Sequence, residues 1–331
     1  MRRTSEKSLG IFNRMITQTI GVEVEMNNIT RRQAAKIAAE FFGTRYEDTN
    51  YRNGYRAWSA WDQRGREWKF EYDSSITGPE EKKCELVTPI LKYEDIPVLQ
   101  ELCRLLRKAG AKSDPTRMCG IHVHVGANGH TPDTLRNLVN LMASHEDLLI
   151  DALHIDRHRI NSYCRMVDPR FVKEINSKKP KTMDALADVW YGSQCCEYGR
   201  THHYNNSRYH MLNLHATFTK GTIEFRLFNF DAPANGKQNG IHAGQLKSYI
   251  QLCLALCQRA KDVKYVSPKI PTARHENPKY VMRFWMKTLG MIGDEFKTAR
   301  ELFVARLSGN SDCRTGDRRV PASTRRNVEA A

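Results

Sequence analysis

Three short runs of the chain have the alternating pattern of β-strands, and each carries two ionisable side chains. The runs are Gly21–Met26, Gly120–Val125 and Thr222–Leu227. Side chains alternate between the two faces of a strand, so each ionisable pair shares one face and the intervening apolar residues share the other. The pairs are Glu23 and Glu25, His122 and His124, and Glu224 and Arg226. This pattern constrains the chain to a sheet with one apolar face and one ionisable face.

If the three strands are neighbours, their carboxylates, imidazoles and guanidinium meet on one surface. Carboxylate oxygens with a histidine nitrogen suit divalent cations, and an arginine with a second histidine suits phosphate. The pattern therefore predicts an active site that holds metal ions and a nucleotide.

Taken alone, each pair has an ordinary explanation. Glu-x-Glu is most often a solvated strand face, His-x-His occurs in zinc sites, and Glu-x-Arg forms charge pairs across sheets. Their occurrence together favours a common site. Other carboxylates can join it: Glu71 and Asp73 share a face of a strand over 66–73, and Glu85 lies among apolar residues in Cys84–Thr88.

The composition is that of an ordinary globular protein. Its 331 residues, 40% hydrophobic and 27% charged, can bury one large core or two smaller ones. No apolar run is long enough to span a bilayer, and no signal-peptide pattern follows the basic N-terminus. The nine cysteines show no paired framework, so reduced thiols are expected. We therefore expect a cytoplasmic protein with no membrane partner.

A formal net charge of +15 predicts attraction of anions. The basic residues concentrate in Arg2–Arg14, Arg157–Lys181 and Arg314–Arg326. Nucleotides, acidic peptides and nucleic acid all fit such a field. Nucleic acid is the less favoured partner, because no aromatic-interleaved RNA motif or DNA-reading helix accompanies the charge.

Hairpins of strands separated by groups of helices indicate an α+β fold with a largely antiparallel sheet. We expect a basic N-terminal arm over 1–16, a catalytic domain over 17–307 and a disordered basic tail over 308–331. Helices are predicted at 31–42, 93–109, 132–153, 239–261 and 279–306, with shorter helical pieces within 154–207. Strands are predicted at 19–26, 84–88, 120–126, 209–218 and 221–229, with a hairpin over 55–72.

Six motifs in a fixed order give the chain a family resemblance. They are Gly-x-Glu-x-Glu, Asp-Ser-Ser-Ile, Glu-Leu-Val-Thr-Pro, His-Val-His-Val, Asn-x-x-Arg-Tyr-x-x-Leu-Asn-Leu and Ile-Glu-Phe-Arg-Leu-Phe. In this order they resemble the putative amidoligase family, carboxylate–amine ligases of the glutamine synthetase and glutamate–cysteine ligase superfamily. The resemblance runs from about Gly21 to Asp231. It implies a glutamine synthetase-like catalytic domain, with a curved, mainly antiparallel sheet around a nucleotide funnel and helices packed outside.

The resemblance also implies a set of metal ligands for Mg²⁺ or Mn²⁺. Glu25 and Glu85 would share one ion. Glu23, His122 and Glu224 would hold the other. Because like charges repel when no cation is bound, we expect Glu23→Ala or Glu224→Ala to leave the metal-free protein as stable as before or more so.

Roles in ATP-dependent ligation follow from the same resemblance. His124 would contact the ATP phosphates, Arg226 would stabilise the transferring γ-phosphoryl group, and Asn213 would line the nucleotide pocket. Arg208 would hold the acyl phosphate or the substrate carboxylate, and Asp73 would ligate a cation or accept the amine proton. In such a ligase the carboxylate becomes an acyl phosphate, the amine displaces phosphate, and ADP is released.

The sequence leaves the substrates open. About twenty residues precede the first strand, so the amino-terminal β-grasp domain of glutamine synthetase is not expected, and glutamine synthesis is not the expected reaction. The carboxylate and amine can belong to small molecules, peptides or proteins. We expect the segments 50–56 and 173–204 to determine the choice, and their basic character favours an acidic acceptor.

Two other functions fit parts of the pattern. A metal-dependent nuclease or phosphodiesterase also uses carboxylates, histidines and a basic surface, but the prevalence of Glu over Asp and the Glu-x-Arg strand favour ligation. A catalytically silent binding protein on the same fold is the other alternative. In that protein the two histidines and Glu224 would point into the core and bind no metal.

Overall fold

The computed structural model describes residues 10–193, 199–202, 204–232, 240–271 and 276–311. Within them an eight-stranded antiparallel sheet has the order β2-β3-β4-β5-β1-β6-β8-β7. The strands are β1 (Ile20–Met26), β2 (Tyr46–Asp48), β3 (Trp58–Trp61), β4 (Glu67–Glu71), β5 (Cys84–Val87), β6 (Ile121–Gly126), β7 (Leu212–Asn213) and β8 (Thr222–Phe228). The predicted α+β fold with an antiparallel sheet is confirmed.

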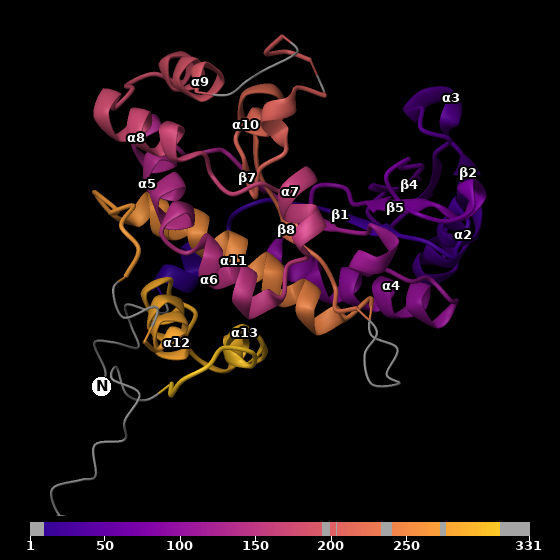
Figure 1. Ribbon diagram of the computed structural model, residues 1–331. Helices are drawn as coiled ribbons and strands as arrows, with labels where there is room; N and C mark the ends of the chain where they lie inside the picture. The colour runs from indigo at the N-terminus through magenta and orange to yellow at the C-terminus, as the bar shows by residue number, and fades with distance from the viewer. Residues whose placement is uncertain (1–9, 194–198, 203, 233–239, 272–275, 312–331) are drawn as a thin grey trace, which may run out of the picture.

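Helices pack around this sheet (Figure 1). They are α2 (Arg31–Phe42), α3 (Asn50–Asn53), α4 (Ile96–Lys108), α5 (Pro132–Ala143), α6 (Glu146–Leu153), α7 (Arg157–Ser162), α8 (Pro169–Lys178), α9 (Met183–Gly192), α10 (His215–Lys220), α11 (Ala243–Asp262), α12 (Pro278–Thr288) and α13 (Lys297–Val304). Helix α2 packs against β2, β3 and β4, and α11 packs against β6. The apolar face of the sheet is thereby buried.

Local sequence signals explain the elements that were predicted well. Thr30 accepts a hydrogen bond from the Gln33 backbone N–H at the start of α2, and Gly43 ends that helix in the left-handed conformation at φ 67°. The hairpin of β3 and β4 turns through Gly65, at φ 73°. Val22 and Val24 of β1 are buried in the core.

The strand predicted over 209–218 is wrong. Only Leu212 and Asn213 pair with β8, and the chain then enters α10. The Asn213 side-chain oxygen accepts the His215 backbone N–H at 2.9 Å, which turns the backbone toward a helix. The helix ends at Gly221, whose φ of 69° suits the left-handed cap.

Two predicted long helices are each broken into two. The segment 132–153 divides at Ser144, whose hydroxyl donates to the Asn140 carbonyl at 2.7 Å and competes with the helical backbone. The segment 279–306 divides where Gly290 and Gly293 take positive φ values of 82° and 88°. Helical periodicity continues across both breaks, which is why the pattern alone missed them.

The described part of the N-terminal arm packs on the domain. Residues 10–15 are helical, and Met15 is buried. The Phe12 ring meets the rings of Tyr93 and Phe296 edge to face at 5.6 and 5.7 Å. Of the predicted tail, 308–311 are described and contact α12, whereas 312–331 lie outside the described residues.

Candidate active site

Cross-strand pairing places the predicted ionisable residues on one face of the sheet. His122 lies opposite Glu23, and His124 lies opposite Glu224. Glu85 lies opposite both Glu25 on β1 and Glu71 on β4. Directly opposed residues point to the same face, so these pairs form a continuous row from β4 to β8.

Glu23 is in the centre of the row, between the two histidines. His122 Nδ1 lies 2.8 Å from Glu23 Oε2 in hydrogen-bonding geometry. His124 Nε2 lies 3.2 Å from Glu23 Oε1 but makes no hydrogen bond, although it is buried. Burial alone would raise the pKa of Glu23, but His124 and His122 outweigh it and hold that pKa well below its ordinary value.

Glu224 is held in its charged form by Arg226. The Arg226 guanidinium donates to Glu224 Oε1, and Asn213 Nδ2 donates to Glu224 Oε2 at 2.6 Å. Burial opposes ionisation, but Arg226 and His124 outweigh it and lower the pKa of Glu224 to about 2.

Glu25 and Glu85 form the acidic end of the row. Glu25 Oε2 accepts the Gly120 backbone N–H at 2.6 Å, and Glu25 Oε1 lies 3.6 Å from His122 Nε2. Burial, followed by repulsion from Glu23 and Glu25, raises the pKa of Glu85 well above its ordinary value. A cation at this end would relieve the repulsion.

The donor set fits divalent cations. Three groups of side chains bring ligand atoms within 4.8 Å of one another: Glu23 with Glu85 and His122; Glu23 with His124 and Glu224; and Glu25 with Asp73 and Glu85. Oxygen-rich sets with an imidazole suit Mg²⁺ or Mn²⁺. The buried His124 Nε2 without a hydrogen bond is an atom that such an ion would satisfy.

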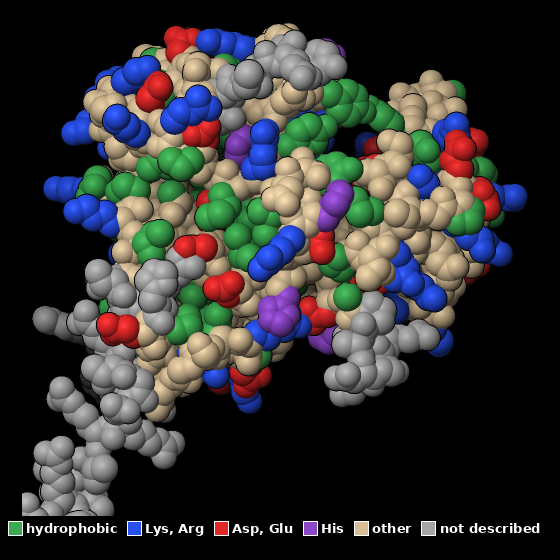
Figure 2. Space-filling view, viewed as in Figure 1, with side chains coloured by type: hydrophobic (Ala, Val, Ile, Leu, Met, Phe, Trp, Pro, Cys, Tyr) green, Lys and Arg blue, Asp and Glu red, His purple; other side chains and the backbone are tan. Residues whose placement is uncertain are grey.

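A cavity of about 460 Å³ lies over this row and opens at the molecular surface. Figure 2 shows a hollow there, between the part of the molecule with α9 and α10 and the part with β3 and β4. Its lining includes six of the predicted site residues: Glu23, Asp73, Glu85, His122, Arg208 and Arg226.

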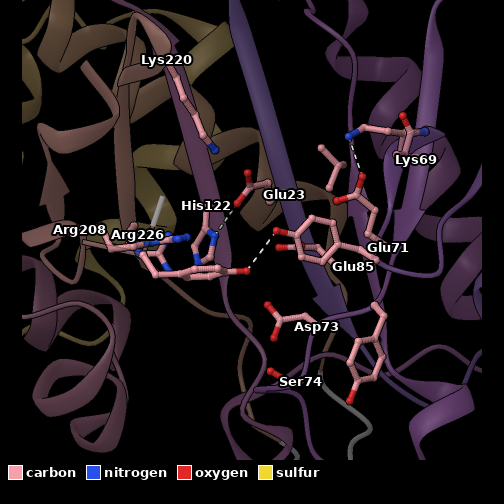
Figure 3. Close-up of a pocket in the computed structure, with 15 residues that line it drawn as sticks. Glu23, Lys69, Glu71, Asp73, Ser74, Glu85, His122, Arg208, Lys220 and Arg226 are labelled. Carbon is pink, nitrogen blue, oxygen red and sulfur yellow. Dashed lines mark hydrogen bonds and ion pairs between the residues drawn. The ribbon is translucent and has the colours of Figure 1, made fainter. Parts of the chain in front are cut away.

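Basic side chains lie on one side of this cavity, and mainly acidic side chains lie on the other (Figure 3). Arg208, Arg226 and Lys220 lie on one side, and Glu71, Glu85 and Asp73 lie on the other, with Glu23 and His122 between them. Glu71 is paired with Lys69 at 2.6 Å. A substrate with an anionic end and a cationic end can therefore lie across the cavity in one orientation.

A second cavity of about 470 Å³ adjoins the first and shares Glu23, Val87 and Lys220 with it. Its lining is largely apolar and includes Val87, Pro89 and Ile90. His124 lines this cavity and not the first, so it lies on the other side of Glu23 from the charged cleft.

Three predicted site residues line neither cavity. Glu25 and Glu224 lie deeper, among buried side chains, where they border the possible cation positions. Asn213 is also buried, and its hydrogen bond orients Glu224. Asn213 therefore lies behind the possible metal ligands and not on a cavity wall.

A pair of tyrosines closes part of the mouth of the first cavity. The Tyr55 and Tyr204 hydroxyls lie 3.1 Å apart, and both residues line the cavity. They come from segments that sequence reasoning associated with substrate choice. Tyr55 adopts a positive φ of 50°, which is uncommon outside glycine and asparagine.

Sequence reasoning missed Lys220 and Arg159. Lys220 lines both cavities, but its sequence position suggested only a turn residue. Arg159 is 2% exposed and lies 3.9 Å from Glu25, although it belongs to the basic stretch Arg157–Lys181 and arginine side chains are mostly exposed in proteins. No sequence signal distinguished Arg159 from its exposed neighbour Arg157.

Comparison with known proteins identifies a family for this chain. A family model described as "putative amidoligase enzyme" matches residues 17–257. The match covers β1 to β8 and most of α11, and thus every residue of the row. Among curated proteins, none matches the chain.

Proposed function

The chain belongs to the putative amidoligase family, and from this premise we propose that it is an ATP-dependent carboxylate–amine ligase. It would form an amide or peptide bond through an acyl phosphate and release ADP and phosphate. This proposal rests on the different side chains on the two sides of the first cavity. A substrate carboxylate can bind on the basic side and a substrate amine on the more acidic side of one reaction centre.

The carboxylate of one substrate would lie against Arg208 and Arg226. Arg226 is buried and oriented by Glu224, so its guanidinium presents fixed donors to the oxygens of a transferring phosphoryl group. Arg208 is on the cavity wall beside Tyr204, with its guanidinium 5.4 Å from the ring centre. This arrangement suits an anion that enters from the mouth.

The amine would lie on the side of Asp73. An amine must lose a proton as it attacks an acyl phosphate, and a carboxylate on its side of the cleft can accept that proton. Asp73 Oδ1 accepts the Ser75 backbone N–H at 2.6 Å, which fixes the side chain while its second oxygen stays available for a proton or a cation.

Mg²⁺ or Mn²⁺ would be held by Glu23, Glu25, Glu85, Glu224 and a histidine. Such ions neutralise the ATP phosphates and the charge that develops during transfer. Two groups of close donor atoms suggest a further way to share the ligands: His124 with Glu23 and Glu224 at one ion, and His122 with Glu23 and Glu85 at another.

The nucleotide would occupy the second cavity. Its apolar lining suits a base, and His124 lies where that cavity meets the acidic row, which suits contact with phosphates. Thr222 lies 3.1 Å from His124 Nδ1 and orients the ring. The reactive end of ATP would then face the first cavity past Glu23.

The substrates would be small molecules, peptides or proteins, with an acidic acceptor favoured by the net charge of +15.

A cytoplasmic location is part of the same proposal. The cysteines that the structure describes are buried and free, as expected in a reducing compartment. No described helix combines the length and apolar character needed to cross a bilayer.

A factorial ADP-release assay tests the function. The protein is incubated with ATP and Mg²⁺, and with pools of carboxylates, of amines, or of both. Ligation predicts ADP release that requires both pools, and mass spectrometry then identifies the amide. Glu23→Gln should abolish it, whereas Glu101→Gln, a control at a surface side chain that is 45% exposed, should not. ATP-independent cleavage of nucleic acid would support the nuclease alternative, and metal binding without turnover would support the silent binding protein.

A further inference from the structure

A bulge in β8 lies directly beside Arg226. Phe225 pairs with Val123 and Phe228 pairs with Ile121, so Arg226 and Leu227 together oppose the single residue His122. A bulge of this kind re-aims side chains and interrupts the backbone ladder. The Arg226 backbone carbonyl accepts its hydrogen bond from elsewhere: Arg159 Nη2 donates to it at 2.9 Å.

Arg159 reaches this carbonyl through a space that only glycine leaves open. It comes from α7, outside the sheet, and its guanidinium lies against Gly120, the residue before β6. A Cβ atom on Gly120 would come within 2.1 to 2.3 Å of three guanidinium atoms. Arg159 and a side chain at position 120 therefore exclude each other.

The same guanidinium borders Glu25. Arg159 Nη1 lies 3.9 Å from Glu25 Oε2, the oxygen that accepts the Gly120 N–H. With Oε2 engaged in this way, Oε1 faces His122. The segment after α7 adds a weaker contact, because the Tyr163 carbonyl accepts from Arg226 Nε at 3.5 Å.

We propose that Arg159, admitted by Gly120, is a positioning residue that replaces the missing ladder partner at the β8 bulge and fixes Arg226 toward the reaction centre. This inference rests on the proposed function only for the role of Arg226 in phosphoryl transfer. The positioning itself is a property of the folded chain without substrates. It assigns α7 a part in catalysis although Arg159 lines neither cavity.

The test compares Arg159→Lys, Arg159→Met and Gly120→Ala with Arg157→Met, an exposed control in the same helix. Turnover of the Arg159→Met and Gly120→Ala proteins should fall about 10²-fold, the effect of a catalytic group misplaced by about 1 Å. The KM for ATP should change little. Arg159→Lys should recover part of the loss, because an ammonium can still donate to the carbonyl.

A double-mutant cycle separates positioning from general damage. Gly120→Ala displaces the guanidinium that Arg159→Met removes, so the two losses should not add in the double variant. Additive losses, or a control as slow as the Arg159 variants, would overturn the inference. Thermal unfolding of each variant shows whether the assay measures folded protein.

A readout without substrates distinguishes this inference from the proposed function. The Arg226 Nε–H resonance, assigned by its absence in Arg226→Lys, should shift and exchange faster with water in both the Arg159→Met and Gly120→Ala proteins. If it does so in a protein that shows no ligation, the positioning stands and the proposed function fails. If ligation occurs and the resonance is unchanged in both variants, the inference is wrong.

Discussion

Glu25 and Glu85 lie directly opposite each other on adjacent antiparallel strands, beneath the acidic side of the cleft. Opposed like charges destabilise a sheet. Burial, followed by repulsion from Glu23 and Glu25, raises the pKa of Glu85 well above its ordinary value, which favours its protonated form when no cation is present. Glu224, at the other end of the row, is ionised beside Arg226.

Glutamine substitutions should therefore affect stability differently at Glu85 and at Glu224. Glutamine resembles a protonated glutamate, so Glu85→Gln should leave the metal-free protein as stable as the parent or slightly more stable. Glu224→Gln removes the charge that faces the buried Arg226 and should lower the free energy of unfolding by about 3–5 kcal/mol. Urea unfolding in excess chelator measures both, and equal effects would contradict the assigned charge states.

The sequence alone led us to expect that removing Glu224 relieves repulsion. The structure changes this expectation, because Glu224 accepts hydrogen bonds from Arg226 and Asn213.

Both the Glu85→Gln and the Glu224→Gln variants should bind Mn²⁺ more weakly than the parent. Isothermal titration with Mn²⁺ checks this, with Glu101→Gln as the control. Affinity equal to that of the parent would exclude these carboxylates as ligands.

Arg226→Lys should slow turnover far more than it weakens ATP binding. Lysine keeps the charge but cannot donate two hydrogen bonds in one plane to phosphoryl oxygens. By analogy with arginine fingers, the loss should be on the order of 10³-fold. Steady-state kinetics and nucleotide titration measure the two effects.

Arg208→Ala should instead raise the KM for the carboxylate substrate, because Arg208 lies on the cavity wall while Arg226 lies at its base. The two variants thus serve as controls for each other. Equal effects of both on ATP affinity alone would contradict the assigned roles.

Glu146 should give the protein a pH-dependent stability independent of the site. It is buried, and burial raises its pKa to about 8 although Glu146 Oε2 accepts the Val167 N–H at 2.9 Å. The unfolded chain ionises near the ordinary value of about 4.3. The folded state therefore binds more protons between these values, and this contribution to stability is present at low pH and lost as pH rises to about 8.

Glu146→Gln removes this proton uptake but can keep the hydrogen bond to Val167. The variant should gain stability over the parent progressively from pH 5 to pH 8, by about 1 kcal/mol per pH unit. Chemical unfolding of both proteins across that range tests the prediction. A constant difference between them would mean that Glu146 ionises in the folded protein as it does in water.

Truncation should show where the folded domain ends. The Asn277 side chain is buried and donates to the Asn310 carbonyl at 2.8 Å, and Arg283 Nη1 donates to the Ser311 carbonyl at 3.2 Å. Deleting 308–331 removes these partners and should lower the melting temperature by about 5 °C. Deleting only 312–331 keeps both hydrogen bonds and should therefore lower the melting temperature less. Calorimetry of both proteins measures the difference, and identical melting temperatures would show that these contacts contribute no stability.

Strand periodicity was sufficient to predict which face of the sheet carries Glu23, His122 and Glu224, since alternation and burial follow directly from local sequence. It could not predict that the chain after Asn213 becomes a helix. That change depends on a side-chain hydrogen bond and on the glycine at 221. Pairing partners are likewise set by tertiary contacts, which local sequence does not encode.

The burial of Arg159 could not be predicted from the sequence. A basic residue in a basic stretch predicts solvation, and its burial depends on the bulge in β8 and on the missing side chain of Gly120. These features lie in three segments that are distant along the chain. Only the three-dimensional structure shows that Arg159, Gly120 and the bulge in β8 lie together.

The lining of the first cavity comes from two kinds of backbone. Glu23, Glu85, His122 and Arg226 belong to paired strands, whereas Tyr55, Asp73, Ser74 and Tyr204 belong to connecting segments. Substitutions in the connections can alter the shape of the mouth without moving the strands. Variants selected for new acceptors should therefore accumulate changes in these connections, other than at Asp73, while retaining the same reaction. Libraries confined to the connections with Asp73 kept would preserve a working reaction centre in most members.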